Sequence, residues 1–220
     1  MRILIIAPHP DDEIIGVGGT IAKRAKAGDE VYVCVVTKGV EPIFKSELVE
    51  QSRSECRQAD KKLGVKETIF LDFPAVMLET IPRYKFNAKI AEVVEKINPD
   101  EVYLPHRGDM QLDHQMVVDA AMVAVRPRGN NYPKKVYAYE TLSETGWNIP
   151  NVINEFIPTV YEDITDTIEL KIEAMNIFKS QLAPFPAARS IGAIEALAKF
   201  RGATVSLKSA EAFSLIREVK

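Results

Sequence analysis

Short apolar runs alternate with longer stretches of helical periodicity along most of the chain. Runs rich in Val, Ile, Leu and aromatic residues predict buried parallel strands at 2–7, 31–36, 68–72, 101–105 and 136–140. Helices are predicted between them, near 15–27, 46–63, 82–97 and 113–125. Gly28 and Gly64 fall just past two of these helices, where glycine often ends a helix. The order predicts an α/β, Rossmann-like three-layer fold, with a mostly parallel sheet and helices on both faces.

The pattern loosens after residue 140. An irregular segment over 141–157 precedes a predicted strand near 159–162 and predicted helices near 165–181 and 189–201. The tail from Ser180 through Phe213 is interpreted as a proline-broken helix pair with a hydrophobic terminus, which packs on the domain or at an oligomer interface. The chain shows no internal repeat and no linker, so a single domain over 1–220 is predicted.

Candidate metal ligands follow two of the predicted strands. His9, Asp11 and Asp12 come directly after the first strand, on a turn stiffened by flanking prolines. Such sites form beyond the carboxyl ends of strands in α/β sheets. His9 and Asp12 are candidate ligands, and Asp11 is a candidate general base. The chain holds three histidines, and the other two, His106 and His114, follow the strand at 101–105. A third ligand is expected from that second segment.

Two structural interpretations compete with this hypothesis. An Asp-Asp-Glu triplet is also typical of a helix N-terminus, where the helix dipole favours negative charge. The glycines of Gly16-Val17-Gly18-Gly19 suggest a nucleotide-binding turn, but they follow an acidic triplet that would repel phosphate. Close packing of the first helix on the sheet explains them better, because glycine has no side chain.

The two polar segments together resemble motifs of a known enzyme family. The first, from His9 to Glu13 with the glycines after it, resembles the opening of the family of N-acetylglucosaminylphosphatidylinositol de-N-acetylases and bacterial LmbE-like deacetylases. The segment from Asp109 to His114 resembles the second motif of that family. The resemblance implies that His9, Asp12 and His114 bind zinc (Zn2+) and that Asp11 is the catalytic base. It also implies an N-acetylglucosamine-type substrate and a homo-oligomer.

Position 111 departs from the family pattern. Gln111 stands where the family usually has a histidine that stabilises the oxyanion or supplies a proton, with Asp113 as the partner of that histidine. A glutamine amide can donate a hydrogen bond but cannot act as an acid. Three outcomes remain open: Asp11 carries out both proton transfers, His106 substitutes, or the activity is weakened.

Several further residues are candidates for contact with a sugar. By the resemblance, Arg53 reaches the sugar, and Arg107 is a second candidate, although charged residues on helix surfaces are usually only solvated. Trp147, in the irregular segment, is either a stacking residue or a cover for the core. Tyr139 is expected to belong to the core.

Composition limits the classes of partner. A net charge of -3 gives no basic surface of the kind that binds nucleic acid. No apolar stretch approaches the ~20 residues of a membrane span, and the opening run is too short for a signal peptide, so a soluble cytoplasmic protein is expected. Cys34 and Cys56 lack metal-binding spacing and are expected to be free thiols.

The sequence therefore predicts a zinc-dependent deacetylase of an N-acetylglucosamine-type sugar, whether free or linked to a nucleotide, lipid or thiol. Two alternatives remain open. One is a metal amidase that acts on a different acyl-amide conjugate, and the other is a catalytically weakened homologue that binds sugar.

Overall fold

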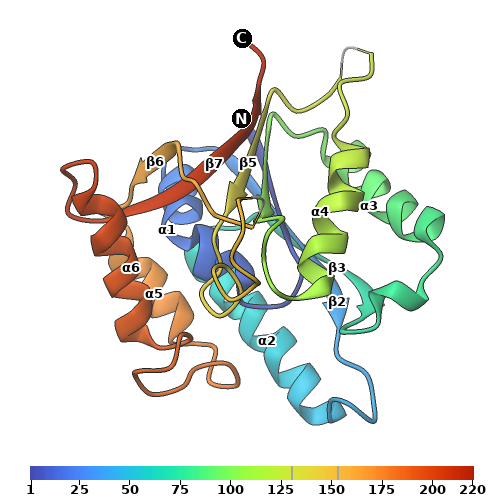
Figure 1. Ribbon diagram of the computed structural model, residues 1–220, viewed down its shortest axis with the longest axis horizontal. Coiled ribbons are helices and arrows are strands. Elements are labelled where there is room, and N and C mark those ends of the chain that lie inside the picture. The colour runs from blue at the N-terminus through green and yellow to red at the C-terminus, as the bar shows by residue number, and fades with distance from the viewer. Residues whose placement is uncertain (130, 153) are drawn as a thin grey trace.

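A seven-stranded, mostly parallel sheet forms the middle layer of the protein (Figure 1). The computed structural model describes residues 1–129, 131–152 and 154–220. The strand order across the sheet is β3-β2-β1-β4-β5-β7-β6, and the first five of these are parallel. The last two positions hold β7 and β6, and β7 pairs antiparallel with both β5 and β6. The strands are β1 (Arg2–Ala7), β2 (Glu30–Lys38), β3 (Glu67–Pro74), β4 (Glu101–Pro105), β5 (Lys135–Tyr139), β6 (Val160–Asp163) and β7 (Ala210–Glu218).

Helices cover both faces of the sheet and enclose two apolar cores. Side chains of α1, α2, α5 and α6 pack in the first core, and side chains of α3 and α4 in the second. Successive residues of β1 alternate between them: Ile3 and Ile5 face the first, Leu4 and Ile6 the second. The three-layer prediction is confirmed. The helices are α1 (Asp12–Lys26), α2 (Ser46–Leu63), the 3-10 turn η1 (Leu78–Thr80), α3 (Arg83–Ile97), α4 (Leu112–Ala124), α5 (Ile168–Met175) and α6 (Ile191–Ala203).

The connection of β1 to α1 explains the early glycines. A Cβ on Gly16 would lie 2.3 Å from Cδ2 of Tyr139, and one on Gly19 would lie 2.8 Å from two side-chain atoms of Ile164. Real Cβ atoms do not approach other atoms so closely. The glycines therefore let α1 pack tightly on the sheet, as the sequence predicts. Tyr139 is fully buried and donates a hydrogen bond to the Ile6 carbonyl at 3.0 Å, which confirms its place in the core.

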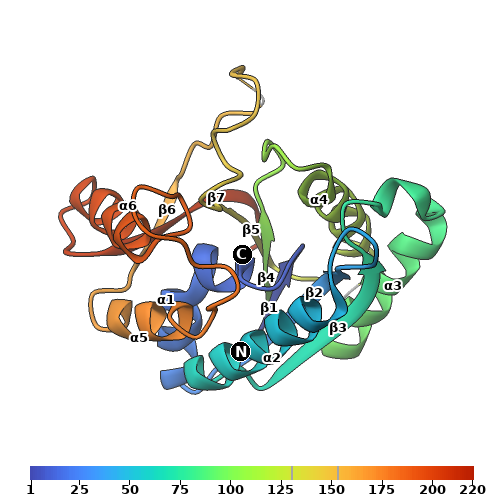
Figure 2. The ribbon, with the colours of Figure 1, turned by 90° about the horizontal axis from the view of Figure 1, so that it is seen from below.

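Figure 2 shows the molecule from below, which is the side at which the parallel strands of Figure 1 end. The order β3-β2-β1-β4-β5 reverses direction between β1 and β4, so the connections after these two strands leave on opposite faces of the sheet. Open α/β sheets bind ligands at such a point. Both sequence motifs lie there, because one follows β1 and the other follows β4.

Three sequence predictions need correction. The first helix begins at Asp12 instead of residue 15, so it takes in part of the first motif. The helix predicted at 165–181 spans only Ile168–Met175. The third error concerns the tail. The sequence predicts a helix pair with a hydrophobic terminus, but that terminus forms strand β7, which lies between β5 and β6 in the sheet.

Cys34 and Cys56 are both buried free thiols, as predicted. In the described part of the chain, no helix combines the length and apolar character needed to cross a bilayer.

A buried ion pair joins β7 to α5, and both of its side chains bond to the first helix. Glu211 on β7 accepts hydrogen bonds from the backbone N–H groups of Gly19 and Thr20, at 2.8 and 2.7 Å. Its carboxylate also pairs with Lys171 Nζ at 2.6 Å, and Lys171 donates to the Ile15 carbonyl at 2.7 Å. Both charged side chains are buried. Each therefore has partners that offset its loss of hydration.

We expect Glu211→Ala to lower the free energy of unfolding by about 3–5 kcal/mol, because it leaves the Lys171 charge buried without its partner. The matched control is Glu162→Ala, which removes a more exposed pair with Lys23 and is expected to cost no more than about 1 kcal/mol. Urea unfolding of both variants measures the difference. Equal losses of stability would show that the buried pair does not hold β7 to α1.

Candidate metal centre and active site

Asp11 occupies a strained backbone position between β1 and α1. Its φ is 112°, a value that residues other than glycine rarely adopt. Hydrogen bonds hold the turn in place, because the Asp11 N–H donates to Glu13 Oε2 at 3.0 Å and its carbonyl accepts from Ile14 and Ile15. The strained turn directs consecutive side chains to different places. Asp12 faces the two histidines, and Asp11 faces a cavity.

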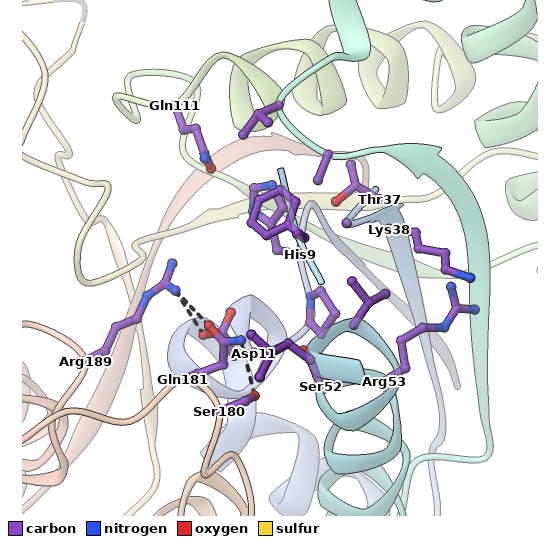
Figure 3. Close-up of a pocket in the computed structure, with 17 residues that line it drawn as sticks. His9, Asp11, Thr37, Lys38, Ser52, Arg53, Gln111, Ser180, Gln181 and Arg189 are labelled. Atoms are coloured by element: carbon purple, nitrogen blue, oxygen red, sulfur yellow. Dashed lines mark hydrogen bonds and ion pairs between the residues drawn. The ribbon is translucent and has the colours of Figure 1, made fainter. Parts of the chain in front are cut away.

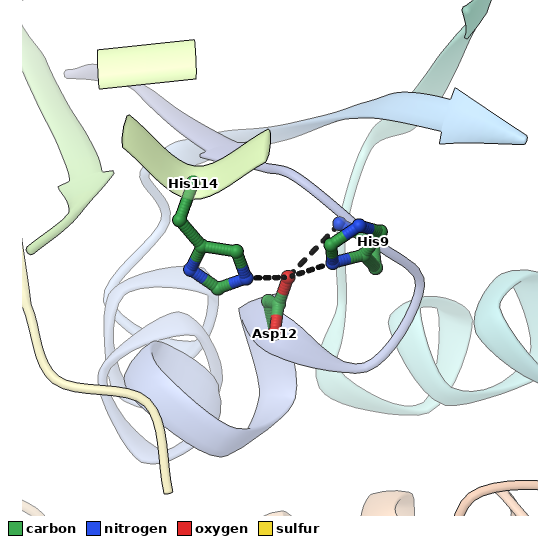
Figure 4. A group of neighbouring side chains, drawn as sticks. All are labelled: His9, Asp12 and His114. Carbon is green, nitrogen blue, oxygen red and sulfur yellow. Dashed lines mark hydrogen bonds and ion pairs between the residues drawn. The ribbon is translucent and has the colours of Figure 1, made fainter. Parts of the chain in front are cut away.

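Three side chains converge on one point at the carboxyl edge of the sheet (Figure 4). Asp12 Oδ2 lies 3.4 Å from His9 Nδ1 and 3.3 Å from His114 Nε2. One ligand atom from each of the three residues lies within 4.8 Å of the others. Asp12 and His114 are fully buried. Asp12 Oδ1 has no hydrogen-bond partner in the described residues, and His114 Nε2 makes no hydrogen bond or ion pair with them other than its contact with Asp12, which suits atoms that bind a metal.

A second carboxylate holds each histidine by its other ring nitrogen. His9 Nε2 lies 3.0 Å from Asp113 Oδ2, and His114 Nδ1 lies 2.9 Å from Asp109 Oδ2. These carboxylates are themselves fixed: Asp113 accepts the N–H of Val76 at 2.7 Å, and Asp109 accepts the Thr145 hydroxyl at 2.6 Å. Carboxylates in this position orient metal-binding imidazoles and raise their basicity. The nitrogens left for a metal are Nδ1 of His9 and Nε2 of His114.

The three candidate ligands form a charged cluster without a metal. Burial opposes ionisation of Asp12, but the charge of His114 and hydrogen bonds to both histidines outweigh it and hold the pKa of Asp12 well below its usual value. Burial also disfavours protonated His114, yet Asp12 and Asp109 together raise its pKa to about 10. For His9, burial is outweighed by the hydrogen bonds to Asp113 and Asp12, so its pKa is raised as well. The protein thus stabilises positive charge where a cation would bind.

Asp11 lies beside this cluster, and no hydrogen bond from the described residues reaches its carboxyl group. The residue is 1% exposed. Arg189 Nη1 is 3.5 Å from Oδ2 and provides a nearby positive charge. Burial raises the pKa of Asp11 to about 7, although Arg189 acts in the opposite direction. A carboxyl group with this pKa can both accept and return a proton near neutral pH.

A cavity of about 330 Å³ opens over these residues (Figure 3). Its polar lining includes His9, Asp11, Gln111 and Arg189, and Arg53 and Lys38 also contribute. The volume is at the lower end of the range for small-molecule sites. The candidate ligand His9 and the candidate base Asp11 both line this cavity, so it adjoins the three-residue cluster.

The structure places two further predicted residues in this site and one outside it. Gln111 lines the cavity, and its backbone N–H at the start of α4 donates to Glu144 Oε2 at 3.1 Å. Arg53 also lines it, pairs with Asp72 and stacks 4.2 Å from the centre of the Phe70 ring. Arg107 is not among the lining residues. Its guanidinium pairs with Asp119 at 2.8 Å on the surface.

The structure also places three other residues that the sequence analysis considered. Asp113 Oδ2 contacts the candidate ligand His9, and no hydrogen bond from Asp113 to Gln111 is seen among the described residues. His106 lies away from the cavity, where its Nε2 contacts the Asn154 carbonyl at 3.1 Å and its ring packs on Phe156. Trp147 is 59% exposed and does not line the cavity. His106 is therefore badly placed to substitute for a catalytic histidine.

Sequence reasoning missed Arg189, Asp109 and Glu144 as parts of the site. Asp109 belongs to the second motif, so its nearness to His114 was available as a signal. Arg189 reaches Asp11 from a loop that comes after α5, and Glu144 reaches Gln111 from the irregular segment after β5. No local pattern marks these two residues, because only the path of the folded chain brings them to the site.

A second buried group of potential ligands lies nearby. Glu13, Cys56 and Asp60 have ligand atoms within 4.8 Å of one another. Cys56 Sγ is 3.5 Å from Glu13 Oε1 and 3.7 Å from Asp60 Oδ2, which also accepts the Thr68 hydroxyl at 2.6 Å. Burial raises the pKa of Asp60 to about 7 and that of Glu13 well above its usual value. Protonated carboxyl groups can share hydrogen bonds here without a cation.

Comparison with known proteins gives the class of protein. The chain matches the model of the PIG-L family, GlcNAc-PI de-N-acetylase, over residues 4–125, and it belongs to this family. It is 29% identical over 187 residues to the uncharacterized deacetylase YaiS of Escherichia coli, covering 81% of this chain and 90% of that protein.

Two solved structures extend the comparison to the fold. The N,N'-diacetylchitobiose deacetylase from Pyrococcus horikoshii is similar with a TM-score of 0.78 and 25% identity, covering 98% of this chain and 83% of that one. The zinc inhibited form of teicoplanin deacetylase Orf2 shares the fold, with a TM-score of 0.74 at 18% identity, covering 97% of each chain.

We expect a divalent metal ion such as zinc to bind this cluster more tightly as pH rises. The pKa of His114 is raised to about 10, so its ring carries a proton near neutral pH, and the pKa of His9 is raised as well, whereas a metal needs both rings neutral. Each displaced proton makes the apparent affinity rise about tenfold per pH unit below the pKa. Competition with a chelator at pH 6, 7 and 8 measures the slope. His106→Gln is the control and should keep it, whereas an affinity independent of pH would exclude both histidines as ligands.

Proposed function

We propose that this protein is a zinc-dependent de-N-acetylase that hydrolyses the acetamido group of an N-acetylglucosamine-type sugar. The observation that carries the proposal is the buried carboxyl group of Asp11, which accepts no hydrogen bond from the described residues and faces a cavity beside the three-ligand cluster. Membership of the PIG-L family supports deacetylation as the reaction. The relative named as a diacetylchitobiose deacetylase supports an N-acetyl sugar as the substrate.

The donor set supports zinc as the metal. Two imidazoles and one carboxylate are a common ligand set of catalytic zinc, which keeps a fourth position open. Bound zinc would act as a Lewis acid toward the acetyl carbonyl and make water more acidic.

Asp11 performs the proton transfers in this proposal. Its carboxylate accepts a proton from the attacking water as the water oxygen bonds to the carbonyl carbon. The protonated carboxyl group then gives that proton to the nitrogen as the C–N bond breaks. Acetate and the amino sugar are the products. The pKa of about 7 suits both steps, because neither protonation state is strongly disfavoured near neutral pH.

Gln111 and Arg189 complement Asp11. The Gln111 amide lies in the cavity lining and can donate a hydrogen bond to the developing oxyanion, but it has no proton to give up. With His106 bonded elsewhere, Asp11 remains to carry out both transfers. Arg189 positions the base: hydrogen bonds to Ser143 Oγ at 3.0 Å and Gln181 Oε1 at 3.1 Å fix its guanidinium next to Asp11.

Asp11→Asn is expected to keep the bound zinc but to lose about 10²- to 10⁴-fold in kcat, because an amide cannot accept the proton of water. His114→Ala is expected to lose the metal. The assay measures acetate released from a panel of N-acetylated amino sugars and simple N-acyl amides, alongside metal content. Release from the simple amides alone would favour a metal amidase of another kind. Absence of release from metal-loaded protein across the panel would favour a non-catalytic homologue.

Arg189→Ala is expected to lower kcat by about 10- to 100-fold with little change in KM, since it removes a charged contact to the base and not to the sugar. Arg189→Lys should recover part of the loss, and added guanidinium should partly rescue the alanine variant. Metal content and melting temperature serve as controls for folding, with Arg83→Ala as the matched surface variant. A defect confined to KM would instead make Arg189 a substrate-binding residue.

A further inference from the structure

Part of the cavity lining is apolar. We call Phe44, Leu48, Val49, Ala75 and Val76 the apolar wall, because all five are apolar residues that line the same cavity as His9 and Asp11. The first three come from the start of α2 and the loop before it, and the last two follow β3. Large apolar side chains that remain exposed next to a binding site commonly mark a contact surface for a ligand or partner.

Exposure distinguishes the deep part of the cavity from its mouth. Asp11 and the ligand cluster are buried, whereas Leu48 is 54% exposed, and Phe44 and Val76 are 37% and 38% exposed. An acetamido group that reaches Asp11 must therefore lie at the deep end. The part of the molecule that extends outward from the sugar then passes the apolar wall.

The charged side chains that line the cavity argue against an anionic group attached to the sugar. The cavity is lined by three cationic side chains, Lys38, Arg53 and Arg189. Each already has an acidic neighbour: Glu50 is 3.4 Å from Lys38, Asp72 pairs with Arg53, and Asp11 is 3.5 Å from Arg189. A phosphate group would have to compete with these carboxylates. A neutral apolar group has no such competitor on the apolar wall.

We propose that the substrate is an amino sugar whose glycosidic substituent is an apolar alkyl or aryl group, and that this group lies on the apolar wall. The inference rests on the proposed deacetylase function and narrows its substrate class. The inference favours an apolar group as the substituent on the sugar over a nucleoside diphosphate. It also assigns the exposed side chains of Phe44, Leu48 and Val76 to substrate binding, not to contact between two copies of the chain.

The test compares acetate release from methyl, butyl and octyl N-acetylglucosaminides, in both anomers, with release from UDP-N-acetylglucosamine. We expect kcat/KM to rise at least about tenfold from methyl to octyl, mainly through KM, because each buried methylene group adds affinity. The nucleotide sugar should be no better than the methyl glycoside. Equal rates along the alkyl series, or a preference for the nucleotide sugar, would overturn the inference.

Leu48→Gln tests the apolar wall directly and should bring the octyl-to-methyl ratio toward one. The matched control is Leu215→Gln on β7, a leucine that is 40% exposed and does not line the cavity, and it should keep the ratio. If Leu48→Gln changes the mass of the assembly by light scattering and keeps the ratio, the wall is a subunit interface and the inference fails.

Direct binding separates this inference from the proposed function. Calorimetry with zinc-loaded protein measures the affinity of the octyl and methyl glycosides without requiring turnover. Tighter binding of the octyl glycoside with no acetate released would retain the assignment of the wall and refute the deacetylase proposal. Acetate release together with equal affinities for both glycosides would retain the deacetylase proposal and refute the assignment of the wall.

Discussion

Asp12 is a carboxylate at 0% exposure, and the organisation of the site depends on how its charge is compensated. Removing a carboxylate from water costs several kcal/mol unless partners surround it. Here Oδ2 accepts the backbone N–H of His9 at 2.9 Å and faces a ring nitrogen of each histidine. Asp12 thereby links the turn after β1 to the start of α4. Because His9 and His114 are each held by a further carboxylate, the cluster is rigid before any cation binds.

The strained turn at Asp11 separates two neighbouring carboxyl groups into different environments. Asp12 has cationic partners and remains ionised, while burial raises the pKa of Asp11 to about 7. Neighbouring groups whose pKa values are driven apart by their surroundings are typical of acid–base sites. These two neighbouring residues therefore have different proposed roles: Asp12 binds a metal, and Asp11 transfers a proton. The backbone conformation, with φ at 112°, makes that division possible.

The sequence was most informative where function lies in local motifs. His9, Asp12 and His114 follow strands that end at the same edge of the sheet, so their convergence could be predicted from strand order. Glu211 shows the opposite case. A charged residue near the start of β7 obscures its apolar pattern, and its burial is explained only by its pairing with Lys171 from α5 and its hydrogen bonds to α1. Arg189 likewise reaches Asp11 through tertiary structure alone.

The apolar wall and the paired cations of the cavity also lie beyond what motifs reveal. Phe44 and Leu48 precede and open a helix that periodicity predicts correctly, yet their exposure follows from the position of that helix beside the site. The family resemblance makes Arg53 a candidate for contact with the sugar. Its pairing with Asp72 on β3, however, decides how much of its charge is available to a ligand. Substrate preference therefore depends on contacts between elements, whereas the proposed chemistry depends on two short segments.

A crystal structure of the zinc-loaded protein, with anomalous scattering recorded at the zinc edge, would locate the metal among the candidate ligands. We expect one strong peak within about 2.0–2.2 Å of His9 Nδ1, His114 Nε2 and an Asp12 oxygen, with Asp11 outside the coordination sphere. A peak bound by Asp11 in place of Asp12, or one located only among Glu13, Cys56 and Asp60, would contradict this expectation.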